Sequence, residues 1–138
     1  MADIEHLASV AIDCGLHIHK ELGPGLLESV YEAILAERLS RLAFRVERQK
    51  LLPVEFDGLR LQDGYRVDLL VDGKLIIEVK SVERLAPVHG KQLLTYLRLA
   101  KQPVGLLMNF GGETFREGLR RIVNGPADII PFPTDRRE

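Results

Sequence analysis

Apolar residues in the first third of the chain recur every three to four positions. Those within residues 4–21 are Ile4, Leu7, Ala8, Ala11 and Ile12, and those within residues 27–42 are Val30, Ile34, Leu35 and Leu39. This spacing places apolar side chains along one face of a helix. Between the two segments, Leu22-Gly23-Pro24-Gly25 interrupts the pattern. The sequence therefore predicts two amphipathic helices separated by a sharp turn.

From residue 52 the apolar positions alternate with polar ones. The alternation covers three segments, residues 52–56, 65–71 and 74–80. The turn sequence Asp57-Gly58 follows the first, and Asp72-Gly73 separates the other two. A period of two is typical of strands with one buried face, so we expect three consecutive strands.

The rest of the chain adds one helix and one strand. A helical pattern spans residues 89–100 after Pro87, and the apolar run at residues 103–110 indicates a buried strand. The prolines of residues 126–138 indicate an irregular tail. The predicted order is ααβββαβ, a mixed α/β (α+β) fold, and we place a single domain at residues 1–125.

Composition fits a soluble globular domain. The chain has 138 residues, of which 46% are hydrophobic and 28% are charged. It has no apolar run near the ~20 residues of a membrane helix and no signal-peptide pattern, so we expect no membrane partner. Its one cysteine, Cys14, excludes an intrachain disulfide and favours a cytoplasmic location.

Charge is balanced overall but uneven along the chain. Lys and Arg number 19 against 20 Asp and Glu, which argues against a protein that coats nucleic acid by bulk charge. Residues 84–101, however, contain no acidic residue. The basic residues there are Arg84, Lys91, Arg98 and Lys101, and a second group comprises Arg116, Arg120 and Arg121. A local basic edge for a phosphodiester therefore remains open, as do ordinary solvated helix faces.

The two strands around Asp72-Gly73 carry the main candidate residues. Asp68 lies in the first strand, and Glu78 and Lys80 lie in the second. A two-residue turn would place Asp68 and Glu78 on opposite faces, whereas a three-residue loop with Gly73 left-handed places them on the same face. Because both apolar faces must reach one core, we predict the three-residue loop, with Asp68, Glu78 and Lys80 together.

Two carboxylates and a lysine on neighbouring strands suit a hard divalent cation and a phosphate group. Mg²⁺ prefers oxygen ligands and is often held by one or two carboxylates together with substrate phosphate. Such an ion can polarise a phosphoryl group and lower the pKa of a bound water, while a lysine stabilises negative charge. An ordinary ion pair between exposed strands would show the same residues, so spacing alone leaves both interpretations open.

A family resemblance becomes visible at these residues. Asp68 followed by Glu78-Val79-Lys80 resembles the Asp…Glu-x-Lys signature of the PD-(D/E)XK nuclease superfamily. The order ααβββαβ is also similar to the core of that superfamily, a central mixed sheet flanked by helices. More narrowly, Gly25-Leu-Leu-Glu28-Ser-Val-Tyr31 resembles the pattern of the GxxExxY protein family, and Gln92-Leu-Leu-Thr-Tyr96 is similar to that family too.

The resemblance implies a role for each matching residue. The metal ligands for Mg²⁺ or Mn²⁺ would be Asp68, Glu78, Glu28 and the backbone carbonyl of Val79. Lys80 would be the catalytic lysine, and the residues that position substrate would be Gln92, Tyr96 and Tyr31. One departure is Val67, which stands where the superfamily name has proline. An alternative for Glu28 is a favourable place in the first turn of its helix.

The resemblance implies a metal-dependent nuclease that acts on nucleic acid, with DNA preferred to RNA. A second hypothesis is a nuclease-like module without catalysis that binds nucleic acid or a protein partner. A third is a carboxylate-pair hydrolase for another substrate, although the lysine beside the carboxylates suits phosphate better. The sequence leaves open whether the chain forms a homodimer.

Overall fold

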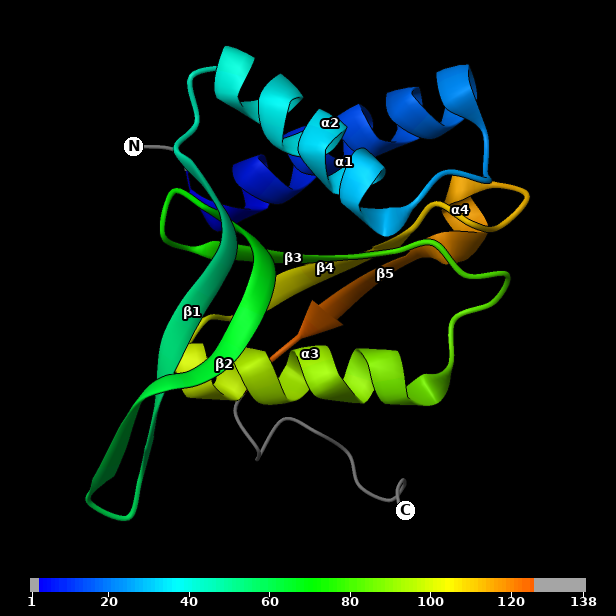
Figure 1. Ribbon diagram of the computed structural model, residues 1–138. Coiled ribbons are helices and arrows are strands. Elements are labelled where there is room, and N and C mark those ends of the chain that lie inside the picture. The colour runs from blue at the N-terminus through cyan, green and yellow to red at the C-terminus, as the bar shows by residue number, and fades with distance from the viewer. Residues whose placement is uncertain (1–2, 126–138) are drawn as a thin grey trace.

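The computed structural model describes residues 3–125, which form a five-stranded sheet with helices on both faces (Figure 1). In chain order the elements are α1 (Ile4–Leu22), α2 (Glu28–Arg41), β1 (Val46–Phe56), β2 (Leu59–Val71), β3 (Leu75–Lys80), α3 (Pro87–Ala100), β4 (Val104–Asn109), α4 (Phe115–Gly118) and β5 (Leu119–Val123). The predicted irregular tail, residues 126–138, lies outside the described residues.

The strands lie in the order β1-β2-β3-β4-β5. Only β3 and β4 run parallel, and the other neighbouring pairs are antiparallel. The parallel pair is joined through α3, because two parallel strands need a crossover connection. The predicted α/β class, a central mixed sheet flanked by helices, is confirmed.

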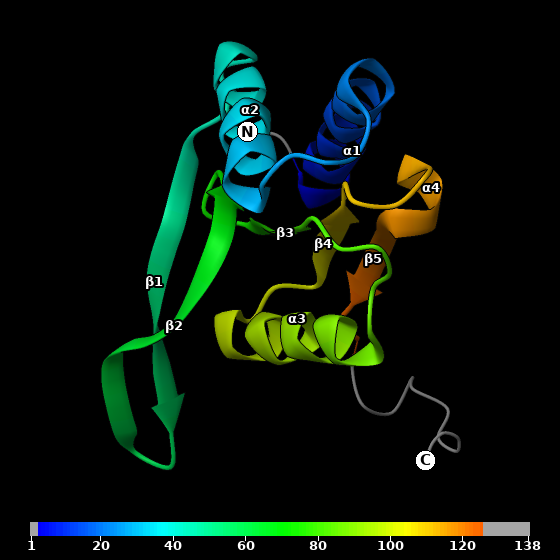
Figure 2. The ribbon, with the colours of Figure 1, turned by 45° about the vertical axis from the view of Figure 1, so that its right-hand side comes forward.

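One face of the sheet is covered by α1 and α2 (Figure 2). Residues of α1 such as Leu7 and of α2 such as Leu35 pack there against Leu69 and Ile77 of the sheet. Val30, which the predicted apolar stripe of α2 included, is instead 38% exposed. Within residues 3–125 no helix has the length and apolarity needed to cross a membrane.

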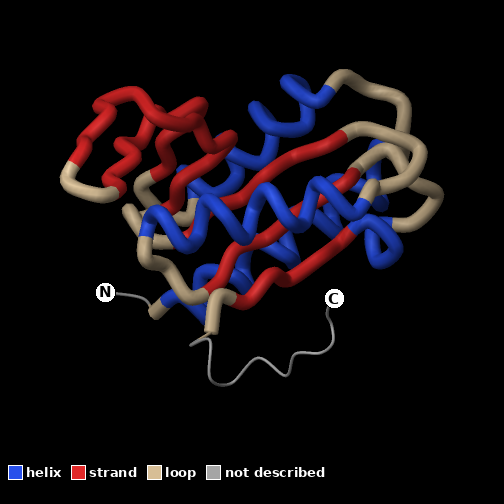
Figure 3. Tube along the Cα trace, turned by 90° about the horizontal axis from the view of Figure 1, so that it is seen from below, coloured by secondary structure: helices blue, strands red, loops and turns tan. Residues whose placement is uncertain are grey.

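The opposite face of the sheet is covered by α3, which lies across the strands when seen from that side (Figure 3). Leu93 and Leu97 of this helix pack against Leu70, Ile76 and Leu107. Both faces of β3 are therefore buried, and only its last residue is partly exposed. This double cover explains why β3 is almost continuously apolar.

The loop between β2 and β3 confirms the predicted register. Val71 pairs with Leu75, so the loop has three residues, and Asp72 and Gly73 have φ angles of 52° and 67°. The Asp72 side chain accepts a hydrogen bond from the N–H of Arg45 at 2.8 Å, which helps to hold this left-handed turn. Even-numbered residues of β2 consequently face even-numbered residues of β3.

The structure contains more sheet than the periodicity predicted. β1 begins at Val46, β2 begins at Leu59, and together they form a long hairpin that projects from the body (Figure 1). The first six residues of β2 are all exposed, so no alternation marks them. The short elements α4 and β5 were likewise not predicted, because β5 is an edge strand with little burial.

Candidate active site

The backbone pairing of the sheet is interrupted at Asp68, and we call this interruption the opening of the sheet. On the β1 side the pairing passes from Leu69 to Val67 without a partner for Asp68, and on the β3 side it stops at Leu69↔Ile77, within the residues described. This irregularity turns the strand, so that Val67 packs in the cluster under α3 while Leu69 packs under α1 and α2. Val67 and Leu69 would share one face of a regular strand, as the period of two predicts for residues 65–71, and for this reason they do not.

The side chains of Asp68 and Glu78 bond across this opening. Glu78 Oε2 accepts a hydrogen bond from the Asp68 N–H at 2.8 Å, and Asp68 Oδ2 accepts one from the Val79 N–H at 2.8 Å. The two carboxylates thus take the place of the missing ladder bonds between β2 and β3. Their predicted proximity is confirmed.

Glu78 is a buried carboxyl group, with 5% of its surface exposed. Burial in the first place, and the Asp68 carboxylate in the second, raise the pKa of Glu78 from 4.5 to about 8. The Asp68 N–H and the Lys80 ammonium act in the opposite direction, and Glu32 adds to the rise. A carboxyl with so perturbed a pKa is a candidate functional group, because a bound cation would offset the same repulsion.

Lys80 ends β3 and is partly exposed. Its influence on Glu78 indicates that its ammonium group lies near the carboxylate pair. Its backbone pairs with Asn109 at the end of β4, and its carbonyl accepts a hydrogen bond from the Phe110 N–H at 2.8 Å. The pairing of β3 with β4 therefore fixes the position of the Lys80 backbone at the end of the sheet.

Glu32 and Gln49 also belong to the site, although no motif in the sequence assigns them to it. Glu32 is buried in α2 and accepts hydrogen bonds from Arg48 Nε at 3.0 Å and Gln49 Nε2 at 2.7 Å. Gln49 Nε2 also donates to Asp68 Oδ1 at 3.2 Å. Glu32 lies on the apolar side of α2 beside Tyr31 and Leu35, and a charged residue in that position could have indicated its role from the sequence. Nothing in the sequence marks Gln49 in the same way.

Glu28 lies in the first turn of α2 and forms no hydrogen bond with the carboxylate pair. Its side chain is exposed in the first turn of α2, and it makes no hydrogen bond or ion pair within residues 3–125. No group of three or more His, Cys, Asp or Glu side chains in that part of the chain is placed to hold a metal ion. The helical acid that contacts the site is Glu32, one turn later, because it faces the sheet while Glu28 faces solvent.

Tyr31 occupies the core and not a substrate-contacting surface. It is 0% exposed, and its ring stacks on Phe110 with a centroid separation of 4.6 Å. Its hydroxyl donates to the Gly23 carbonyl at 2.5 Å and accepts from the Leu26 N–H at 3.2 Å. The expectation that Tyr31 touches substrate is therefore corrected: this side chain holds the turn between α1 and α2.

Replacing Tyr31 by phenylalanine is expected to lower the free energy of unfolding by about 1–3 kcal/mol. The ring can still stack on Phe110, but a carbonyl and an N–H of the turn lose their hydrogen bonds. Urea unfolding measures the change. Tyr65→Phe is the control, because its hydroxyl makes a long contact of 3.5 Å to the Tyr96 carbonyl and should matter less. Equal losses in the two variants would contradict the role given to the Tyr31 hydroxyl.

Tyr96 approaches the carboxylate pair from the side of α3. Burial first, and then the carboxylates of Glu78 and Asp68, raise the pKa of Tyr96, while Arg66 acts in the opposite direction. Its ring lies against that of Tyr65, with centroids 4.9 Å apart. Gln92, one turn earlier on α3, is exposed. The structure therefore brings Tyr96 to the site and leaves Gln92 at the surface.

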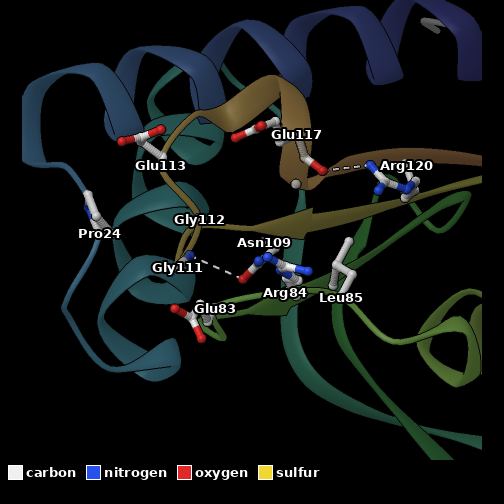
Figure 4. Close-up of a pocket in the computed structure, with 11 residues that line it drawn as sticks. Pro24, Glu83, Arg84, Leu85, Asn109, Gly111, Gly112, Glu113, Glu117 and Arg120 are labelled. Atoms are coloured by element: carbon white, nitrogen blue, oxygen red, sulfur yellow. Dashed lines mark hydrogen bonds between the residues drawn. The ribbon is translucent and has the colours of Figure 1, made fainter.

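A hollow of about 890 Å³ lies at the carboxyl ends of β3 and β4 (Figure 4). Asn109, the strand neighbour of Lys80, lines it, so the hollow adjoins the lysine side of the site. Its charged lining residues are Arg84, Arg120, Glu83, Glu113 and Glu117. Because the lining carries both positive and negative side chains, the hollow is not the uniformly basic surface that a phosphodiester backbone would favour. The Arg120 guanidinium is also held by the carbonyls of Glu117 and Leu119.

The chemistry of the donor set fits a hard divalent cation. Asp68 and Glu78 supply carboxylate oxygens on facing strands, and one oxygen of Glu78 accepts no hydrogen bond from residues 3–125. Such oxygen ligands, with few from protein and the rest from water or phosphate, suit Mg²⁺ or Mn²⁺. The residues that would hold the ion are Asp68, Glu78 and the Val79 carbonyl.

Comparison with known families gives one match that spans most of the chain. Residues 5–122 match a family model described as the PD-(D/E)XK nuclease superfamily. Among curated proteins no significant match is found. The matched range includes every element of the sheet up to β5, together with Asp68, Glu78 and Lys80.

Proposed function

Because this chain belongs to the PD-(D/E)XK nuclease superfamily, we propose that it hydrolyses phosphodiester bonds in DNA, with RNA as the less favoured substrate. The observation that carries the proposal is the meeting of Asp68 and Glu78 in the opening of the sheet, next to Lys80. This arrangement concentrates two carboxylates and a lysine at one point, which suits a divalent cation and a phosphate.

Asp68, Glu78 and the Val79 carbonyl would hold Mg²⁺ or Mn²⁺. When bound there, the ion supplies Lewis-acid polarisation of the phosphate and a lower pKa for its bound water. In the hydrolysis the water oxygen bonds to phosphorus, the bond from phosphorus to one sugar oxygen breaks, and that oxygen ends protonated. The residues of the chain hold the reacting groups in line and balance the charge that develops.

Lys80 stabilises the negative charge on the phosphate oxygens, since its ammonium lies near Glu78 without being buried beneath it. The pKa of Tyr96 is raised by burial and then by the same carboxylates, and lowered by Arg66, so that its hydroxyl and the Arg66 guanidinium interact electrostatically with the site. Both can orient the phosphate that flanks the scissile bond. Gln92 is exposed on α3, and we assign it a contact to the bound strand. Glu28 is exposed at the start of α2, and we keep it as the acidic residue that completes or adjusts the cation site.

We also assign the chain to the GxxExxY family within the superfamily, as a single domain over residues 1–125. The support is that Tyr31 of this motif bonds to Gly23 and Leu26, the residues on either side of Gly25 in the turn before α2. Both apolar clusters pack against the same sheet, as expected for one domain.

Lys80→Ala is expected to lower the rate of cleavage by about 10²–10³-fold while the protein stays folded. The assay uses single-stranded, duplex and branched DNA, and RNA of matched sequence, each with Mg²⁺ or Mn²⁺. Lys20→Ala, an exposed lysine near the end of α1, is the matched control. Equal activity of wild type and Lys80→Ala would sink this mechanism.

A nuclease-like module without catalysis is the second candidate. It is favoured by the finding that no three potential ligand side chains within residues 3–125 meet in one metal site. Binding of nucleic acid without cleavage, in a protein that takes up no Mn²⁺ at millimolar concentration, would decide for this alternative.

A further inference from the structure

Gln49 has an unusual backbone conformation for a residue inside a strand. Its φ angle is 49°, in the left-handed region that glycine and asparagine tolerate best. The pairing of β1 with β2 passes from Arg48 to Lys50 and leaves Gln49 out. Backbone of this kind is costly and tends to persist where the surrounding structure needs it.

The Gln49 side chain links two carboxylates from different elements. Its Nε2 donates to Glu32 Oε1 at 2.7 Å and to Asp68 Oδ1 at 3.2 Å. Glu32 has a second donor in Arg48, at 3.0 Å. That bond goes to the other oxygen of Glu32, Oε2, just as the second donor to Asp68, the Val79 N–H, goes to Oδ2. Within residues 3–125 Gln49 is therefore the one donor both to Glu32 Oε1 and to Asp68 Oδ1.

The bond completes the immobilisation of the Asp68 carboxylate. Its other oxygen, Oδ2, is held by the Val79 N–H at 2.8 Å. A carboxylate held at both oxygens cannot rotate about its terminal torsion, which is otherwise broad. Since Asp68 has no ladder partner in β1 within the described chain, its side chain depends on these two donors for its orientation.

We propose that Gln49 is a positioning residue for the cation site, and that its left-handed backbone is retained because it aims the side-chain amide at Asp68. The inference rests on the proposed function, since it concerns the divalent cation that Asp68 and Glu78 would hold. Residues that orient metal ligands are known to matter nearly as much as the ligands themselves. Gln49 acts through Asp68, and contacts neither substrate nor the reacting atoms.

Two substitutions separate this role from a structural one. Gln49→Gly relieves the backbone and removes the amide, and Gln49→Asn keeps an amide and tolerates the same φ but is one methylene shorter. Ala43→Gly is the control, because Ala43 is exposed in the turn before β1 and has a φ angle of 72°. It relieves similar backbone strain away from the carboxylates.

The measurement is the dissociation constant of Mn²⁺, by isothermal titration calorimetry, together with the melting temperature of each metal-free variant. We expect both Gln49 variants to melt near the wild-type temperature and to bind Mn²⁺ about tenfold more weakly or worse. Ala43→Gly should bind Mn²⁺ as the wild type does.

The outcomes distinguish this inference from the proposed function. Wild-type affinity for Mn²⁺ in both folded Gln49 variants overturns the positioning role and leaves the proposed nuclease intact. A wild-type protein that binds no Mn²⁺ at millimolar concentration contradicts the proposed function, and the positioning role with it. If Gln49→Gly fails to fold, Gln49→Asn carries the comparison with Ala43→Gly.

Discussion

Asp68→Asn is expected to lower the rate of phosphodiester cleavage by about 10³-fold or more, with the protein still folded. The substitution removes the charge that would bind the cation and keeps the shape of the side chain. The amide oxygen can still accept the hydrogen bond from the Val79 N–H, so the side-chain link between β2 and β3 is kept. Cleavage rates and Mn²⁺ titrations, each with a thermal melt, measure the effect.

The matched control is Asp63→Asn in the exposed part of β2. The substitution makes the same change of charge on the same strand. The Asp63 side chain itself makes no hydrogen bond or ion pair within residues 3–125. We expect wild-type cleavage from this variant. If Asp68→Asn also cleaved at the wild-type rate, Asp68 would not be a ligand of a catalytic ion, and the proposed site would have to be abandoned.

Glu78→Gln is expected to stabilise the metal-free protein at pH 8.5, by on the order of 2–4 kcal/mol. The buried Glu78 carboxyl has its pKa raised to about 8, and the ordinary value is 4.5. Below 4.5 the group is protonated in both folded and unfolded protein. Between 4.5 and 8 the unfolded chain releases the proton while the folded protein keeps it, so stability falls as pH rises. Above pH 8 the carboxyl is ionised in both states, and the folded protein bears the full cost of the buried charge.

Glutamine cannot ionise, so the variant lacks this decline. The difference in unfolding free energy between Glu78→Gln and wild type should grow from pH 5 to pH 8.5, as measured by urea unfolding. Glu37→Gln is the control, because Glu37 is exposed and paired with Arg41. A difference that stays constant over this range would show that Glu78 does not hold its proton in the folded protein.

The same proton links stability to the cation. Mn²⁺ must displace the proton from Glu78, so the rise in melting temperature on adding Mn²⁺ should be larger at pH 8.5 than at pH 6. Glu78→Gln should show little rise at either pH. The variant that makes the metal-free protein more stable is therefore the one expected to lose activity, as is common where a buried charge serves function.

Local patterns sufficed for the elements that bury one regular face. The spacing of Leu7, Leu35 and their neighbours predicted α1 and α2, and the loop at residues 72–74 followed from matching the faces of two strands. That loop in turn predicted the meeting of Asp68 and Glu78, because the side chains of a strand alternate with a fixed period. The exposed hairpin and β5 escaped prediction since they bury little surface.

The rest of the site was decided by packing between distant segments. Which glutamate of α2 reaches the sheet depends on how that helix is rotated about its axis. Glu28 and Glu32 are four residues apart and lie on one side of the helix, so their spacing does not tell which of them is buried. The burial of Tyr31 follows from its stacking on Phe110, about eighty residues away in the chain.

The sequence alone determined the fold class, the loop register and the pair Asp68 and Glu78, because each depends on periodicity within one or two neighbouring segments. Only the tertiary structure decided that the sheet opens at Asp68, that Glu78 is buried deeply enough for its pKa to rise, and that Gln49 joins Glu32 to Asp68. Burial and irregular backbone arise from contacts between elements, which no local pattern records.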